Sequence, residues 1–287
     1  MRSWCFVRSI KPTPRASLQS VFLLFVGMIM ALPSLAVETG GPEAEVETKI
    51  GEKSAPASPT GPWTGVVGLG PMVFPRYSGG TGRQTWLIPL ISASYEDIVN
   101  IEPLRATVYL WGSDDRKKGL GFAIEPRLGF TAGDGPRLAG IARRKDSLEG
   151  GPTFDWDLGV LALSASLMTD LTQSSQSNSA RLYAYRELIS HDSLKLGVFG
   201  GFDWLNSKTA NYFFGIRPSE QSPSRAPFQP GTALNATAGF DGRYRLSEHY
   251  SLLFGVQRYR LGTAAARSPI VETRQSALGW LGLGWNL

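Results

Sequence analysis

Few side chains in this sequence could do chemistry, and the two histidines are the first to consider. His191 and His249 stand beside Asp192 and Glu248 in short polar segments that we predict to be tight turns. A hydrolase needs a nucleophile, a base and an orienting group within reach of one another, and isolated turn histidines do not supply that set. The single cysteine, Cys5, lies in a leader sequence, and two separate histidines lack the spacing of metal ligands. We therefore predict a protein that is not an enzyme and has neither a cofactor nor a metal site.

Charged residues of both signs recur at alternate positions of several predicted strands. They are Arg105, Glu125, Arg127, Asp155, Asp157, Lys195, Asp203, Asp241, Arg243 and Arg245. Inside a barrel, such a row could form the selectivity ring of a channel, or it could form a network of ion pairs that fills the lumen. Eight strands enclose only side chains and sixteen or more enclose a water channel, so about ten should be nearly filled. We therefore prefer the ion-pair network.

The strands that would position this row are clearest in TALNATAGFDGRYRL, residues 232–246. Leu234, Phe240 and Tyr244 fall on one side of the alternation, and Asp241 and Arg243 fall on the other. Successive side chains of a strand point to opposite faces, so the segment has an apolar wall and a polar wall. Its length of ~15 residues exceeds the usual ~5–6 of a soluble strand and suits a tilted bilayer span. The pattern predicts an all-β, transmembrane, antiparallel up-and-down β-barrel.

The first 62 residues are predicted to lie outside this barrel. A basic leader, an apolar run at 21–32 and the small residues Ser34 and Ala36 indicate a signal peptide over 1–36. Residues 37–62 are rich in Pro, Gly, Ser and Glu and contain no aromatic residue, so we predict a disordered acidic tail. The leader holds four of the 29 basic and none of the 24 acidic residues, which leaves a net charge of +1. That balance does not favour a nucleic-acid partner.

From Trp63 onward, strand-like runs alternate with turn segments, which predicts a barrel over 63–287. The runs are 63–71, 85–95, 98–111, 119–131, 153–170, 180–189, 194–204, 232–246, 250–261 and 276–287. This gives about 10 strands, within a range of 10–12. The apolar phase changes near Gly159, where a β-bulge is expected. The final run places Leu287 on the apolar wall, as outer-membrane barrels do, although the last residue is usually aromatic.

Connection lengths give an independent indication, because outer-membrane barrels have short periplasmic turns and long extracellular loops. If the N-terminus is periplasmic, the connections at 72–84, 112–118, 172–179, 205–231 and 262–275 face outward, and all are long. Those at 96–97, 190–193, 247–249 and 132–152 face inward, and only 132–152 is long.

The exceptional segment, 132–152, is also basic, with Arg137, Arg143, Arg144 and Lys145 around apolar residues. We consider three interpretations: a lumen plug, a periplasmic surface for a partner, or a variable loop. In the longest loop, at 205–231, the aromatic residues Tyr212, Phe213 and Phe214 could form a binding patch, but we expect them to fold onto the barrel mouth.

Four stretches occur in a characteristic order. They are GVVGLGPMVFPRYSGG at 65–80, NYFFGI at 211–216, RSPIV at 267–271 and the glycine-rich final strand. Over 63–287 the chain resembles the MltA-interacting protein (MipA)/OmpV family of outer-membrane proteins, which brings no catalytic residues. The final Leu287 and the acidic segment before Trp63 depart from the family pattern.

The resemblance implies a barrel in the cell outer membrane, in contact with its lipid. It also implies a scaffold role with periplasmic murein-processing enzymes as partners, because the best-known member is a scaffold that joins a lytic transglycosylase to a peptidoglycan synthase. The alternatives are a small channel for a polar solute, a surface adhesin, and a soluble periplasmic β-barrel binder.

Overall fold

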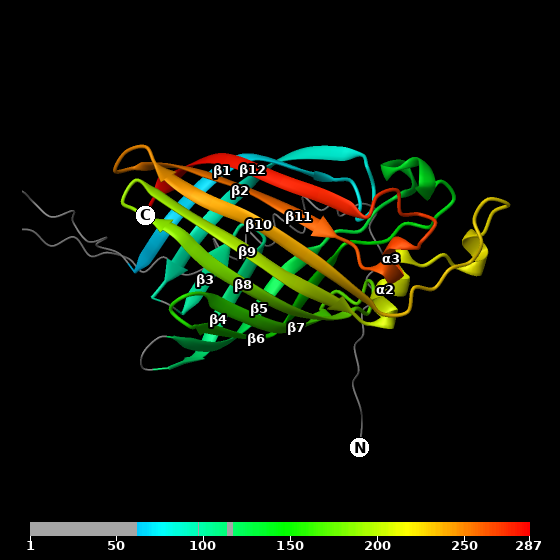
Figure 1. Ribbon diagram of the computed structural model, residues 1–287, viewed down its shortest axis with the longest axis horizontal. Coiled ribbons are helices and arrows are strands. Elements are labelled where there is room, and N and C mark those ends of the chain that lie inside the picture. Colours follow the sequence, from blue (N-terminus) through cyan, green and yellow to red (C-terminus); the bar gives the residue numbers. More distant parts are fainter. Residues whose placement is uncertain (1–61, 97, 114–116) are drawn as a thin grey trace, which may run out of the picture. The chain divides into compact units, whose positions relative to one another are not determined.

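The computed structural model describes residues 62–96, 98–113 and 117–287 (Figure 1). The predicted signal peptide with Cys5, and the predicted tail as far as residue 61, lie outside the described residues. None of the helices in the described part of the chain has the length and apolar composition that a membrane-crossing helix requires.

The described residues form a closed antiparallel barrel of twelve strands, in which each strand pairs with the next in sequence and β1 pairs with β12. The strands are β1 (Trp63–Pro75), β2 (Arg83–Tyr95), β3 (Val99–Glu102), β4 (Arg105–Gly112), β5 (Lys118–Arg127), β6 (Ser147–Asp157), β7 (Ala162–Asp170), β8 (Asn178–Ser190), β9 (Leu194–Leu205), β10 (Ala233–Arg245), β11 (Tyr250–Arg260) and β12 (Gln275–Asn286). The helical elements are α2 (Ser207–Phe214), α3 (Thr263–Ala266), η1 (Ala132–Asp134), η2 (Pro136–Leu138) and η3 (Pro218–Glu220). The predicted fold class is confirmed.

The two walls of β10 have the predicted orientation. Leu234 and Phe240 are 54% and 40% exposed, whereas Asn235 and Thr237 are buried. In a soluble sandwich the large apolar side chains of a strand would pack inside. Here they form the outer surface and the polar side chains form the interior, which is the arrangement of a barrel in lipid.

The prediction of a single strand at 98–111 is wrong, because this segment forms a hairpin. β3 and β4 pair with each other from Val99 opposite Val108 to Glu102 opposite Arg105, and Pro103 and Leu104 form the turn. A proline cannot donate to a strand ladder, so it ends β3 here.

The predicted single strand at 153–170 is also two strands. β6 and β7 pair from Asp157 opposite Ala162, and Gly159 lies in the turn between them with a φ of 81°. The predicted β-bulge at Gly159 is therefore wrong: the phase change marks a reversal of the chain. A positive φ costs glycine little, which suits it to this turn.

These two additional strands change the predicted side of two connections. Gly112 and Lys118, where β4 ends and β5 begins, lie at the end of the barrel that holds the short turns, which we call the turn end. Segment 128–146 lies at the opposite end, the loop end, with 76–82, 171–177, 206–232 and 261–274. Both predicted positions were thus inverted. With the correction every long loop from β5 onward lies at one end, where Figure 1 shows α2 and α3.

Candidate functional site

A buried carboxylate, Glu149 of β6, is the centre of an ion-pair network in the lumen. It is fully buried, and it accepts hydrogen bonds from Arg127 Nε at 2.6 Å and Nη2 at 3.0 Å. Arg181 Nη2 donates to it at 2.8 Å, as does Ser177 Oγ at 2.8 Å. Charge-assisted bonds from two guanidinium groups compensate for the cost of burying the carboxylate.

The network extends across the lumen to further carboxylates. Asp203 of β9 lies 3.5 Å from Arg127 and 3.3 Å from Arg181. Glu125 pairs with Arg181 and also lies 3.5 Å from Arg105. Ion pairs therefore connect side chains of five strands, β4, β5, β6, β8 and β9, across the lumen.

The structure brings together four of the ten charged residues predicted from the sequence: Arg105, Glu125, Arg127 and Asp203. Asp155 lies apart from these four and accepts a hydrogen bond from Tyr109 Oη at 2.7 Å.

The other five predicted residues also lie outside the network. Asp157 accepts a bond from the Gly159 N–H in the β6–β7 turn, and Lys195 and Arg245 are exposed near the turn end. Within the described residues, Asp241 and Arg243 are half-buried and form no ion pair.

Sequence reasoning missed Glu149 and Arg181, which hold the network together. Glu149 was missed because β6 was predicted to begin only at Thr153. Arg181 was missed because the run at 180–189 had no clear alternation. Arg181 does share its face with Tyr183 and Tyr185, since all three are opposite inward-facing residues of β9. The occurrence of these three residues at every second position could have predicted that Arg181 faces the lumen.

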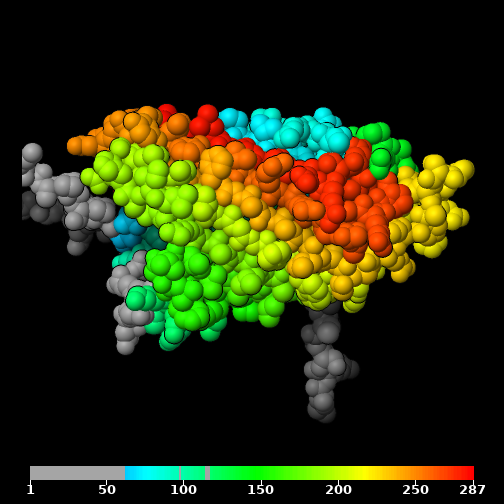
Figure 2. Space-filling model, in the orientation of Figure 1, coloured from blue at the N-terminus to red at the C-terminus, as the bar shows by residue number. Residues whose placement is uncertain are grey.

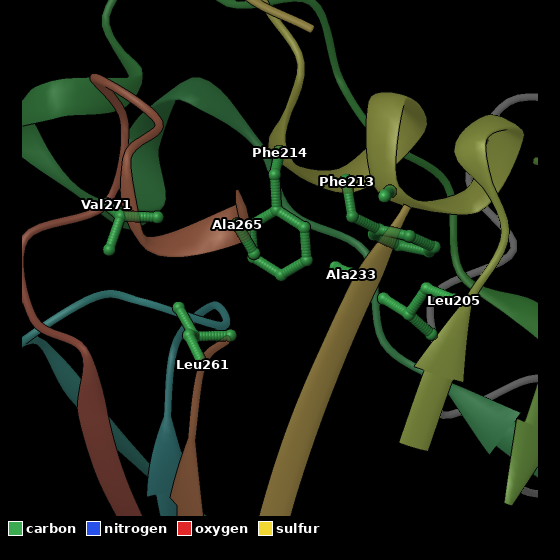
Figure 3. Packing of buried hydrophobic residues seen from close by; sticks show 8 residues of the cluster. Leu205, Phe213, Phe214, Ala233, Leu261, Ala265 and Val271 are labelled. Atoms are coloured by element: carbon green, nitrogen blue, oxygen red, sulfur yellow. The ribbon is translucent and has the colours of Figure 1, made fainter. Parts of the chain in front are cut away.

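The loop end is covered by a packed apolar cluster, shown in Figure 3. Phe213 and Phe214 of α2 pack with Leu261, Ala265 and Val271 from the β11–β12 segment, and with Leu205 and Ala233 from the ends of β9 and β10. The expectation that the aromatic residues of the longest loop fold onto the barrel mouth is thus confirmed. In Figure 2 the segments that carry α2 and α3 lie side by side at this end.

A second apolar cluster adds two more of the long loops to this end of the barrel. Tyr77 from 76–82, Phe130, Leu138 and Ile141 from 128–146, and Ile216 and Ile270 pack together. We call the two clusters and the loops that carry them the cap. Four of the five long connections contribute to it, so the cap is a small folded core over the lumen.

One buried ion pair fastens the cap. Arg144 is 1% exposed, and its Nη1 and Nη2 lie 2.7 and 2.9 Å from the two oxygens of Glu220 in η3. Its Nε donates to the Tyr212 carbonyl at 2.6 Å. Burial alone would raise the pKa of Glu220, but hydrogen bonds from Arg144 and from the Arg217 and Ala142 amides outweigh it and lower the pKa to about 2.

The predicted location of Arg137, Arg143, Arg144 and Lys145 on the periplasmic side is wrong, since segment 128–146 belongs to the loop end. Arg144 is buried in the cap, and Arg137 donates to the Val271 carbonyl. Arg143 and Lys145 are exposed. The segment is therefore part of the cap, and it offers no surface at the turn end.

The two histidines lie in turn-end connections, as their surroundings in the sequence indicated. The His191 Nδ1 is 3.1 Å from Ser193 Oγ, and the His249 ring packs against Trp285 in a tilted arrangement, with ring centroids 4.9 Å apart. Among the residues that the structure describes, no three His, Cys, Asp or Glu side chains are arranged to hold a metal ion.

Comparisons with known proteins give consistent results. A family model described as "MltA-interacting protein MipA" matches residues 67–287. Outer membrane protein Omp26La of Vibrio anguillarum and outer membrane protein OmpV of Vibrio cholerae serotype O1 are each 25% identical over 144 residues, covering 50% of this chain and 54% of the relative. The chain thus spans about half the length of the curated relatives it matches.

Solved structures show only a weak likeness. The outer-membrane expressed OmpT of Vibrio cholerae matches with a TM-score of 0.33 and 8% identity, covering 69% of this chain and 61% of that one. This similarity is too low to define the fold.

Proposed function

Because the chain belongs to the MltA-interacting protein MipA family of outer-membrane proteins, we propose that it is a non-enzymatic scaffold that holds a murein-processing enzyme against the inner face of the outer membrane. The protein is an outer-membrane β-barrel, so its loop end faces outward and its turn end faces the periplasm. The family description names a partner, the murein enzyme MltA, and a partner of that class is what we extend to this chain.

The observation that most supports a scaffold over a channel is that two layers of side chains occupy the lumen: the ion-pair network and, nearer the loop end, the cap. Glu149, Arg127 and Arg181 cross the interior, and the cap lies beyond them at the loop end. A conducting pore needs a continuous water-filled path, as in wide barrels. Because the lumen is filled, the outer surfaces of the barrel are the parts that remain available to bind a partner.

The first test is single-channel recording of the purified protein in planar bilayers. We expect little or no conductance, because an ion would have to displace both the ion-pair network and the cap. Steady steps of porin size would contradict this and favour the alternative of a channel for a polar solute.

The second test is capture of a purified lytic transglycosylase by the barrel in detergent. A periplasmic partner can reach only the turn end, where Asp192 and Glu248 are exposed. We expect the double variant Asp192→Lys and Glu248→Lys to reduce capture several-fold. The matched control is Arg143→Ser with Lys145→Ser, two exposed charges of the loop end, which should capture as the wild type does.

Two outcomes of the capture experiment would reject the scaffold. One is binding no stronger than to an unrelated outer-membrane barrel. The other is loss of binding in the loop-end control with the turn-end variant unaffected. Heat-modifiable migration of each variant verifies that the barrel has folded.

A further inference from the structure

Three arginines lie on the outward face of the barrel wall near the loop end: Arg83, which begins β2, and Arg258 and Arg260, which end β11. Arg83 shares the odd-numbered face of β2 with Leu87, and the other two share the even-numbered face of β11 with Val256. Leu87 and Val256 are 68% and 39% exposed, so both faces point away from the lumen. All three arginines are exposed as well. They therefore face outward, where the membrane surrounds the barrel.

The three side chains converge on the start of β12. Arg83 Nη1 donates to the Ala277 carbonyl at 3.2 Å, so this side chain crosses β1 and reaches β12. Ala277 is directly opposite Arg258, whose Nη2 lies 3.4 Å from Gln275 Oε1, and Gln275 is in turn opposite Arg260. Neighbouring strands are only ~4.7–4.9 Å apart. The three residues thus form one group, which we call the arginine cluster.

The arginine cluster has no counter-charge of its own. Among the residues that the structure describes, none of its three members forms an ion pair. The carboxylate of Glu272, in the adjoining β11–β12 segment, accepts hydrogen bonds from the Thr81 N–H and Oγ1 instead. A guanidinium carries five N–H donors, and most of those in the cluster remain available to a ligand. Because like charges repel, an anion that used these donors would be stabilised here.

The cluster occupies one sector of the rim. Arginines that only kept the edge of the barrel in water, with their stems along the wall, would be expected all round it. The outward residues at the loop-end edges of β5, β7, β9 and β10 are apolar instead, and they are between 37% and 54% exposed: Leu128, Leu171, Trp204 and Leu234. The concentration of arginine over β12 therefore indicates a local site rather than a general anchor.

The wall next to the cluster, toward the turn end, is apolar. Leu87 of β2, Leu281 of β12 and Val256 of β11 are 68%, 49% and 39% exposed on its outer face. Gly279 lies between them, opposite Val256, and has no side chain to fill the space: a Cβ there would approach only the Gly255 carbonyl oxygen and Val256 Cγ2, at 3.4 and 3.7 Å. A ligand that fits both surfaces has an anionic head and an apolar body.

The height of the cluster in the membrane points to the source of such a ligand. The loop end faces outward, so the cluster lies at the level of the headgroups of the outer leaflet. In a bacterial outer membrane the anionic lipid of that leaflet is lipid A, a phosphorylated and acylated glycolipid. Guanidinium groups bind phosphate through parallel N–H bonds, which makes arginine well suited to this headgroup.

We propose that the arginine cluster is a binding site for lipid A on the outer wall of the barrel. A phosphate is held by Arg83, Arg258 and Arg260, and acyl chains lie along the wall over Gly279 and Leu281. The site is independent of the scaffold role, which uses the turn end. Failure of one proposal therefore leaves the other unaffected.

Native mass spectrometry of the full-length protein, purified in detergent and incubated with lipid A, tests the proposal. We expect the wild type to retain lipid A and the double variant Arg83→Gln with Arg258→Gln to weaken retention at least about 10-fold, since a hydrogen bond to a charged group contributes at least this factor in affinity. Arg143→Gln with Lys145→Gln removes two exposed charges from the same end, in the cap. This charge-matched control should retain lipid A as the wild type does.

A second control separates the cluster from any arginine that faces the membrane. Arg186 is exposed on the outward face of β8 near the turn end, opposite Val198, so Arg186→Gln should not change retention of lipid A. Two further probes identify the part of the ligand that is bound. Lipid A without its phosphates should be retained at least about 10-fold more weakly, because it lacks the anionic head. Inorganic phosphate at the concentration of the lipid should not displace lipid A, because it lacks the acyl chains.

Four results would each overturn the lipid A site. They are unchanged retention in the Arg83 and Arg258 variant, an equal loss in either control variant, equal retention of the dephosphorylated lipid, and displacement of lipid A by inorganic phosphate at equal concentration. Heat-modifiable migration confirms that each variant is folded before its bound lipid is counted.

Discussion

Replacing Glu149 with glutamine is expected to destabilise the barrel by about 3–5 kcal/mol, the usual cost of removing one partner from a buried ion pair. Glutamine has nearly the same size, so no cavity forms and the effect comes from charge. Arg181, which is buried, and Arg127, which is partly buried, would both lie beside a neutral amide, with Asp203 as their remaining shared carboxylate. Urea unfolding in detergent, followed by the loss of heat-modifiable migration, measures the change.

Asp157→Asn is the control for this experiment, because it removes one carboxylate from the same strand outside the network. Asp157 is exposed and bonds only to the Gly159 N–H in the turn, so we expect a change below about 1 kcal/mol. If Glu149→Gln were as stable as Asp157→Asn, the network would contribute nothing to the fold. In that case, the preference for a filled lumen would lose its energetic basis.

The barrel could be predicted from sequence because lipid imposes a simple rule on each strand. The alternation of Leu234, Asn235 and Thr237 is enough to predict which side chains face lipid and which face the lumen, and no distant residue has to be considered. Turns inside a run are harder to detect. Gly159 shifts the apolar phase by either a bulge or a reversal, and only the pairing of β6 with β7 decides between them. Pro103 was the better signal, since a central strand rarely accepts proline.

The cap could not be predicted in the same way. Arg144 and Glu220 are 76 residues apart and lie in two loops without regular periodicity, so no local pattern links them. Within 128–146 the basic residues look alike, yet Arg144 is buried while Arg143 is exposed. Arg144 differs from Arg143 because the barrel brings Glu220 close to it. Whether these two loops meet at the same end of the barrel depends on the number of strands between them. The missed hairpin at β3 and β4 therefore also misplaced this loop.

Replacing Glu220 with glutamine is expected to open the cap while the barrel stays intact. Arg144 would lose its bidentate partner, and Arg217 and Ala142 would lose the carboxylate that their amides share. At ~3–5 kcal/mol for a broken buried pair, amide hydrogen exchange in 128–146 and 206–232 should accelerate by about two to four orders of magnitude. Arg143→Gln, which changes the neighbouring exposed charge, should leave exchange unchanged.

The same pair predicts how the wild-type cap responds to acid. The pKa of Glu220 is lowered from its ordinary 4.5 to about 2, so its stabilisation is complete above pH 4.5 and is lost as the pH falls toward 2. Exchange in both loops, corrected for the intrinsic effect of pH, should therefore rise between these values in the wild type. In Glu220→Gln it should already be fast and independent of pH there. A cap that stays protected at pH 2 would mean that the apolar clusters alone hold it closed.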